Sequence, residues 1–131
     1  MKSNEKYLSF ISIPISIGEL IDKITILEIK KLHMSGIKLN NVEKELTSLK
    51  SIIQDQNIEI DINLITSLQE VNSSLWEIED KLRIKEKQQD FNHEFIELAR
   101  SVYLKNDKRA FIKKEINIRY NSEFIEEKSY K

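Results

Sequence analysis

A basic segment between residues 100 and 119 is the part of the sequence best suited to bind a ligand. It holds seven basic and two acidic residues, a net charge of +5, and Arg109, Lys113 and Asn117 recur in it every four residues. Side chains at that spacing share one helical face and could hold a phosphate or a carboxylate. Three more residues would complete this anion site: Arg100, Lys128 and Tyr130. The interpretation that we favour over a ligand site is a solvated face, neutralised by acidic residues of the tail, since charged helical faces are common.

Two acidic residues are candidates for a general base, should the chain be an enzyme acting on a phosphorylated or carboxylated metabolite. Asp22 lies on a helix that we expect to be covered on two sides, where a buried carboxylate needs a partner such as an arginine. Glu97 lies one helical turn before the basic segment. Arg83 lies between Glu79 and Glu86 at helical spacing, which favours an exposed ion-pair ladder. If this face of the helix packs against a partner helix, the ladder could instead position Arg83 for a ligand.

The residues that cysteine chemistry, a phosphate-binding loop or a metal site would need are missing or incomplete in this sequence. The absence of cysteine excludes disulfides, thiolate metal sites and cysteine nucleophiles, and two glycines cannot form a phosphate-binding loop. Asp90 and His93 have the spacing of a di-iron ligand pair, but no second pair accompanies them. Glu77 and Asp80 match the second half of the magnesium motif of all-α nucleotide pyrophosphatases. The first half, a Glu-x-x-Glu pair, should precede them, but such a pair occurs only after them, at Glu94 and Glu97. We therefore predict no metal and no cofactor.

The composition predicts a single all-α domain over residues 1–131. Hydrophobic residues make up 40% of the chain and charged residues 33%, while two glycines and one proline are too few for the tight turns of an all-β fold. A net charge of -1 gives no general attraction to nucleic acid or to an anionic membrane. No apolar run approaches the roughly 20 residues of a membrane helix. We expect a cytoplasmic protein without a signal peptide.

Capping residues and periodicity place about five helices between an extended arm (1–15) and a tail (121–131). A capping box at Ser16 and Glu19 starts a helix that runs to about residue 34, and Gly36 follows as a left-handed stop. Further helices are expected from 40 or 41 to 54, from an Asp61 or Asn63 cap to 88, from 92 to 104, and, after a turn at 105–107, from 108 to 119. Together they predict an antiparallel helical bundle or hairpin array.

The third of these helices carries a coiled-coil-like seam of almost three heptads. The seam consists of Leu64, Leu68, Val71, Leu75, Ile78 and Leu82. In the helix after it, six residues are expected to be buried: Phe91, Phe95, Leu98, Ala99, Val102 and Tyr103.

Three stretches resemble a family of small bacterial and phage-borne proteins that is known only as a domain of unknown function. They are PISIGELIDKITILEIK at 14–30, LARSVY, NDKRA and KKEIN between 98 and 117, and EEKSY at 126–130. The resemblance implies no established activity, cofactor or catalytic residue. It is compatible with an anionic sugar or nucleotide-sugar partner, because relatives occur near sugar-transfer and envelope-polysaccharide functions.

The leading interpretation is a small helical binding or adaptor domain that self-associates, since the sequence offers a heptad seam and no catalytic constellation. The alternative is a small enzyme acting on a phosphorylated or nucleotide-sugar metabolite. The interpretation as an RNA-binding protein has less support, because no aromatic residues alternate with the basic ones. An enzyme should bring Asp22 or Glu97 to the basic segment inside a pocket, whereas an adaptor should expose an apolar helix face.

Overall fold

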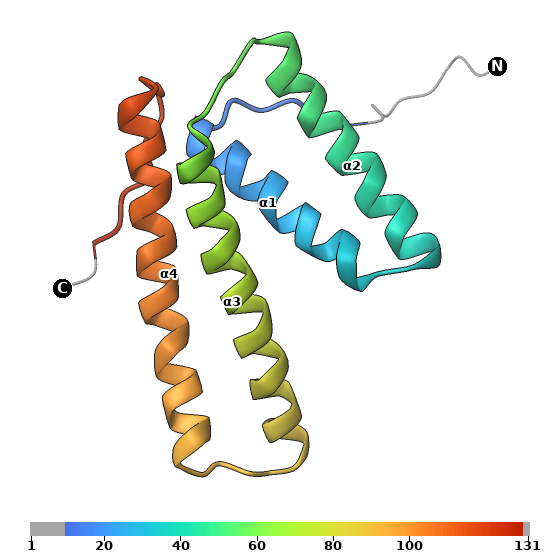
Figure 1. Ribbon diagram of the computed structural model, residues 1–131, viewed down its shortest axis with the longest axis vertical. Helices are drawn as coiled ribbons and strands as arrows, with labels where there is room; N and C mark the ends of the chain where they lie inside the picture. Colours follow the sequence, from blue (N-terminus) through green and yellow to red (C-terminus); the bar gives the residue numbers. More distant parts are fainter. Residues whose placement is uncertain (1–9, 130–131) are drawn as a thin grey trace.

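The structure is a computed structural model that describes residues 10–129, and within them it contains four helices and no strand (Figure 1). The helices are α1 (Ile17–His33), α2 (Gly36–Asp55), α3 (Ile62–Lys87) and α4 (His93–Arg119). The all-α prediction is confirmed, although the helices number four instead of about five. Residues 10–14 of the predicted arm are extended and exposed, and its first nine residues lie outside the described part of the chain.

The first helix begins where its capping residues predict. The Ser16 hydroxyl accepts a hydrogen bond from the Glu19 N–H at 3.0 Å, so Ser16 is the N-cap. Gly36 has the expected left-handed backbone, with φ at 63°, but it begins α2 instead of only ending α1. The predicted start of the second helix at residue 40 or 41 is therefore wrong, because residues 37–39 contain no helix breaker and continue the helix back to the glycine.

The predicted turn at residues 105–107 does not form, and α4 runs without interruption across it. Lys105, Asn106 and Asp107 are only moderate helix formers, but they include neither glycine nor proline. A continuous helix can pack along the whole of α3, and that contact outweighs the weak local preference for a turn. The chain therefore has one 27-residue helix where we expected two.

The central helix is α1, which contacts each of the other three, as its apolar residues on several sides predicted. One core cluster joins α1 to α3 and α4 and consists of Ile21, Leu68, Val71, Ile112 and Ile116. A second cluster joins α1 to α2 and consists of Leu27, Val42 and Leu46. The helix α2 contacts no helix other than α1.

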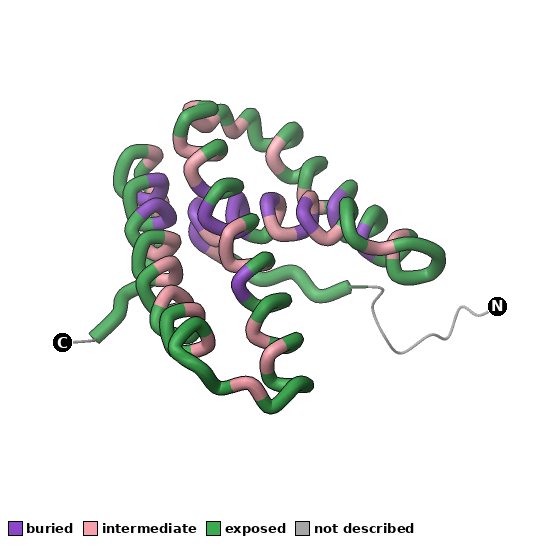
Figure 2. The backbone as a smooth tube through the Cα atoms, turned by 60° about the horizontal axis from the view of Figure 1, so that its bottom comes forward, coloured by how far each residue is buried: buried purple, intermediate pink, exposed green. Residues whose placement is uncertain are grey.

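The helices α3 and α4 form an antiparallel hairpin whose far half extends beyond α1 (Figure 1). Buried residues concentrate on α1 and on the parts of the hairpin beside it, and no residue from 79 to 111 is buried (Figure 2). The seam of α3 packs inside the molecule, with Leu68 fully buried. Phe91, Ala99 and Tyr103 are exposed, contrary to prediction, because among the described residues this half of the hairpin has no other helix packed against it.

The C-terminal tail turns back along α4 after its last residue (Figure 1). Asn121 adopts a left-handed backbone, with φ at 56°, and the Ser122 N–H donates to the Asn117 carbonyl at 2.8 Å. Farther along, Glu126 and Glu127 form ion pairs with Lys113 and Lys114 of α4. The tail thus returns acidic residues to the basic segment.

Candidate functional site

A buried polar network forms where α1, α3 and α4 meet, around the carboxylate of Asp22. This side chain has no exposed surface. Arg109 of α4 donates two hydrogen bonds to it, one from Nε at 2.9 Å and one from a terminal nitrogen to the other oxygen. Asn72 of α3 donates to Asp22 and to the Thr25 hydroxyl, each at 2.9 Å. The carboxylate therefore has the arginine partner that its burial required.

Lys113 forms a second layer above this pair, one helical turn after Arg109. Its ammonium lies 2.7 Å from Glu19, 3.2 Å from Glu126 and 4.0 Å from Asp22. Burial by itself lowers the pKa of Lys113, but the bond to Glu19 and the nearby carboxylate charges outweigh burial, so the pKa is raised. The pKa of Arg109 is raised as well, chiefly by its hydrogen bonds to Asp22. Both cations are therefore firmly charged.

Gly18 and Asn117 join the N-terminus of α1 to α4. The Asn117 side-chain oxygen accepts a hydrogen bond from the Gly18 N–H at 2.6 Å. This N–H belongs to the first turn of α1, where backbone donors have no partner within the helix. A Cβ atom on Gly18 would lie 2.5 Å from the Lys113 carbonyl oxygen, so only glycine permits this helix approach. The Ile17 N–H donates to the Ser122 hydroxyl at 3.1 Å, which adds the tail to the same junction.

The structure brings together part of the predicted ligand site. Asp22, Arg109, Lys113 and Asn117 lie along the junction of α1 and α4, and Lys128 lines a hollow of about 230 Å³ with Arg109 and Lys113. Tyr130 lies outside the described residues. Glu97 and Arg100 lie elsewhere on the exposed surface, and the exposed Arg83 lines a different hollow, which Arg109 also lines.

Two members of the junction were not predicted. Asn72 follows the seam residue Val71, and no pattern in the sequence marks it as the donor to a carboxylate on another helix. Gly18 offered a weak signal, because a glycine inside the first turn of a helix is unfavourable unless a close contact requires it.

The geometry gives Asp22 no role as a general base. A base must reach substrate or water, but this carboxylate is inaccessible and accepts hydrogen bonds from Arg109 and Asn72. Glu97 is exposed and pairs with Arg100 at 3.3 Å on the same helix, away from any described hollow. Asp22 thus reaches the basic segment, as we required of an enzyme, but its carboxylate is not accessible to a substrate, and Glu97 meets the segment only at the exposed Arg100.

The basic segment is largely neutralised by its neighbours. Five of its seven basic residues form ion pairs with acidic residues. The pairs are Arg100 with Glu97, Arg109 with Asp22, Lys113 with Glu19 and Glu126, Lys114 with Glu127, and Arg119 with Asp61. Two of these pairs use Glu126 and Glu127, the acidic tail residues that the interpretation as a neutralised, solvated face invoked.

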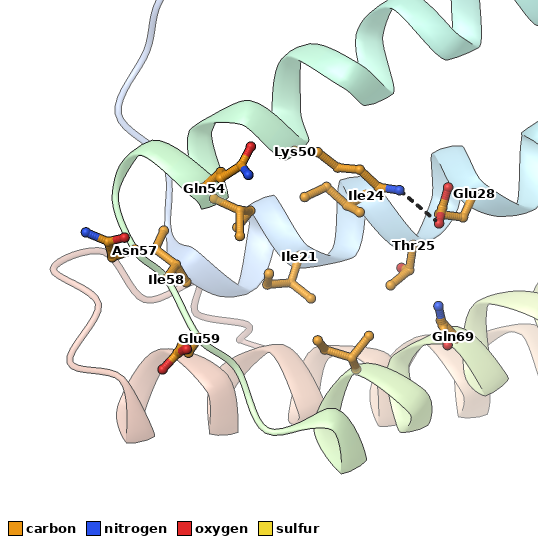
Figure 3. A pocket seen from close by; sticks show the side chains of 12 residues that line it. Ile21, Ile24, Thr25, Glu28, Lys50, Gln54, Asn57, Ile58, Glu59 and Gln69 are labelled. Atoms are coloured by element: carbon orange, nitrogen blue, oxygen red, sulfur yellow. Dashed lines mark hydrogen bonds and ion pairs between the residues drawn. The ribbon is translucent and has the colours of Figure 1, made fainter.

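A hollow of about 700 Å³ lies on the other side of α1 (Figure 3). It is bounded by α1, the end of α2, the following linker and the start of α3, and its lining includes Ile21, Ile24 and Ile58. The charges of Lys50 and Glu28 at its rim pair with each other at 3.3 Å. None of the predicted ligand-binding residues lines it.

An exposed apolar stripe runs along the outer face of α4. Five large side chains are each 51–64% exposed. They are Ile96, Tyr103, Leu104, Phe111 and Ile118, and at about 100° per residue they fall within an arc of roughly 100°. We call these five residues the α4 stripe. The opposite face of α4 carries the buried residues that contact α1 and α3.

Within residues 10–129, no three acidic or histidine side chains converge as a metal ion would require. None of the four helices in this part of the chain is both long and apolar enough to cross a membrane.

Comparison with known proteins identifies a family but no activity. The family model of DUF6165, a family of unknown function, matches residues 11–131. No curated protein matches the chain, and no solved structure matches it. The expected resemblance to a family without a known function is confirmed. Because the match covers nearly the whole sequence, the chain belongs to the family of unknown function DUF6165.

Proposed function

We propose that this protein is a self-associating helical adaptor in which the α4 stripe packs against the α4 stripe of a second copy. The observation that carries the proposal is the stripe itself: five large apolar side chains, each at least half exposed, are aligned along one helix. Contiguous exposed apolar surface of this kind marks interaction sites. The stripe extends for about 33 Å, long enough for extended helix-to-helix packing.

Charged residues between the apolar positions favour a second copy as the partner. Arg100, Asp107 and Lys114 lie on the same face of α4 at intervals of seven residues. Parallel pairing in register would place like charges opposite each other in all three layers. Antiparallel pairing can place Asp107 opposite a basic residue of the partner, which makes the stripe self-complementary under two-fold symmetry.

One antiparallel register satisfies both the charges and the apolar residues. With Arg100 opposite the partner's Asp107, the partner's Phe111 faces Ile96, and the partner's Leu104 faces Tyr103. The symmetry repeats each pair. In this register Asp107 and Phe111 lie beside the tail, and Arg100 exchanges its contact with Glu97 on the same helix for the partner's Asp107. The alternative register would place Asp107 opposite the partner's Lys114 and would compete with the ion pair between Lys114 and Glu127 of the tail.

Sedimentation analysis over a range of protein concentrations tests the proposal. We expect a dimer for the wild type and at least tenfold weaker association for Leu104→Lys, since this residue lies at the centre of the pairing. Leu32→Lys is the matched control, because Leu32 is 82% exposed but lies at the end of α1. A monomeric wild type, or a Leu104→Lys variant that still dimerises fully, would contradict the proposal.

Charge exchange tests the direction and register of the pairing. Asp107→Arg should weaken the dimer, because it places two cations opposite each other. Adding Arg100→Asp to this variant should restore association. Restoration by Lys114→Asp instead would show the alternative register, and restoration by neither change would exclude antiparallel pairing of this face.

A further inference from the structure

The C-terminal half of α1 diverges from the α3–α4 hairpin (Figure 1). A second hollow is lined by residues from these three helices. Its volume is about 550 Å³, within the range of small-molecule sites. Ile26 and Ile29 of α1 and Leu75 of α3 provide apolar lining. Arg109 and Asn106 of α4 also line this hollow, so it borders the network around Asp22.

Several hydrogen-bond donors at this hollow lack good acceptors. The indole N–H of Trp76 is buried and has no acceptor among the described residues. Two nitrogens of the Arg109 guanidinium bond Asp22, but the third makes only a long contact of 3.5 Å to Asn106. The Arg109 side chain remains 28% exposed and is part of the lining of this hollow. An unpaired buried donor costs about 1–3 kcal/mol unless something satisfies it.

Charges of both signs meet at the rim. Arg83 lines the hollow together with Glu79 and Asp80, all from α3. The predicted ion-pair ladder of Glu79, Arg83 and Glu86 does not form: none of these residues, and not Asp80 either, takes part in an ion pair among the described residues. Because Arg109 already pairs with Asp22, the charges left without an ion pair at the rim are one basic and two acidic side chains. This disfavours a simple anion, whereas a ligand with one group of each sign can contact both kinds of side chain.

We propose that this hollow binds a small zwitterion with an apolar body, of the chemical class of the aliphatic and aromatic amino acids. Arg83 and the third nitrogen of Arg109 bind the carboxylate. Glu79 and Asp80 bind the ammonium group. The apolar body packs against Ile26, Ile29 and Leu75, with Trp76 beside it.

This site is independent of the α4 stripe. Asn106 and Arg109 lie on the side of α4 that faces α1, roughly opposite the stripe, so binding does not require the dimer. The larger hollow in Figure 3 is a weaker candidate, because the charges at its rim are paired and no buried donor at its wall lacks an acceptor.

Trp76 is the only tryptophan of the chain, so its fluorescence reports on this hollow directly. Titration with L-leucine or L-phenylalanine up to about 10 mM, enough to detect a Kd near 1 mM, should change the emission saturably. 4-Methylpentanoate, which lacks the ammonium group, and 3-methylbutylamine, which lacks the carboxylate, should each bind at least tenfold more weakly than L-leucine. Equal binding of either analogue, or no saturable change with either amino acid, would overturn the proposal.

A variant on the rim separates specific binding from a general effect on fluorescence. Arg83→Gln should weaken binding of L-leucine at least tenfold while leaving the fold intact, since Arg83 is exposed and forms no ion pair among the described residues. Lys81→Gln is the control, because this exposed neighbour on α3 does not line the hollow. Unchanged affinity of Arg83→Gln would also overturn the proposal.

Discussion

Replacing Asp22 by asparagine tests whether the network between α1 and α4 stabilises the fold through its charge. Asparagine keeps the size of the side chain and one acceptor, but it removes the negative charge that faces Arg109 and Lys113. Asparagine also presents an amide N–H₂ where a carboxylate oxygen accepted a bond. The variant therefore leaves two partly buried cations with less compensation.

The expected loss follows from the burial of the pair. Removing one partner of a buried ion pair costs about 3–5 kcal/mol. Arg109 keeps 28% of its side chain exposed, so water can partly replace the lost carboxylate, and we expect about 2–3 kcal/mol. For a chain of this length, such a loss lowers the melting temperature by about 10 °C.

Urea unfolding at pH 7 and at one fixed protein concentration measures this loss, since dimerisation would otherwise change the apparent stability. A double-mutant cycle with Arg109→Met should show a coupling of about 2 kcal/mol, because the second change removes the unpaired charge. Glu28→Gln is the control: it breaks an exposed pair with Lys50 and should cost less than about 1 kcal/mol. A loss below about 1 kcal/mol for Asp22→Asn, or a coupling near zero, would refute the reasoning.

Two further predictions concern the same junction. Gly18→Ala should destabilise the protein by about 2 kcal/mol in urea unfolding, because the new Cβ meets the Lys113 carbonyl. Gly36→Ala, whose Cβ meets nothing, should cost only about 1 kcal/mol from its left-handed backbone, and equal losses would count against the close approach. Because the pKa of Lys113 is raised, its contribution is complete below about pH 10.4 and is lost as the pH rises through the folded-state pKa. The difference in the free energy of unfolding between wild type and Lys113→Met should therefore shrink from pH 9 to pH 11.5. Lys114→Met is the control and should show a smaller change. A constant difference for Lys113→Met would argue against a contribution from the charge of Lys113.

The starts of α1 and α3 and the central position of α1 were predictable from the sequence. Ser16 and Asp61 accept hydrogen bonds from N–H groups of the first turn, a function that serine and aspartate perform in any protein. The apolar residues on several sides of α1 required cover on more than one side, and the structure provides it. The need of a buried Asp22 for an arginine partner followed from the cost of desolvating a carboxylate.

The tertiary structure alone decided which arginine meets Asp22, and that Asn72 and Gly18 belong to the same junction. These contacts join residues 50 to 99 positions apart, and no short-range pattern encodes such distances. It also decided that α4 is one helix, since packing along α3 outweighs a weak local turn preference. Finally, α4 has apolar residues on two faces, and the sequence by itself shows both of them without indicating which one is buried. Only packing determined that Ile112 and Ile116 are buried while the α4 stripe stays exposed, because a helix at the edge of the molecule has neighbours on one side only.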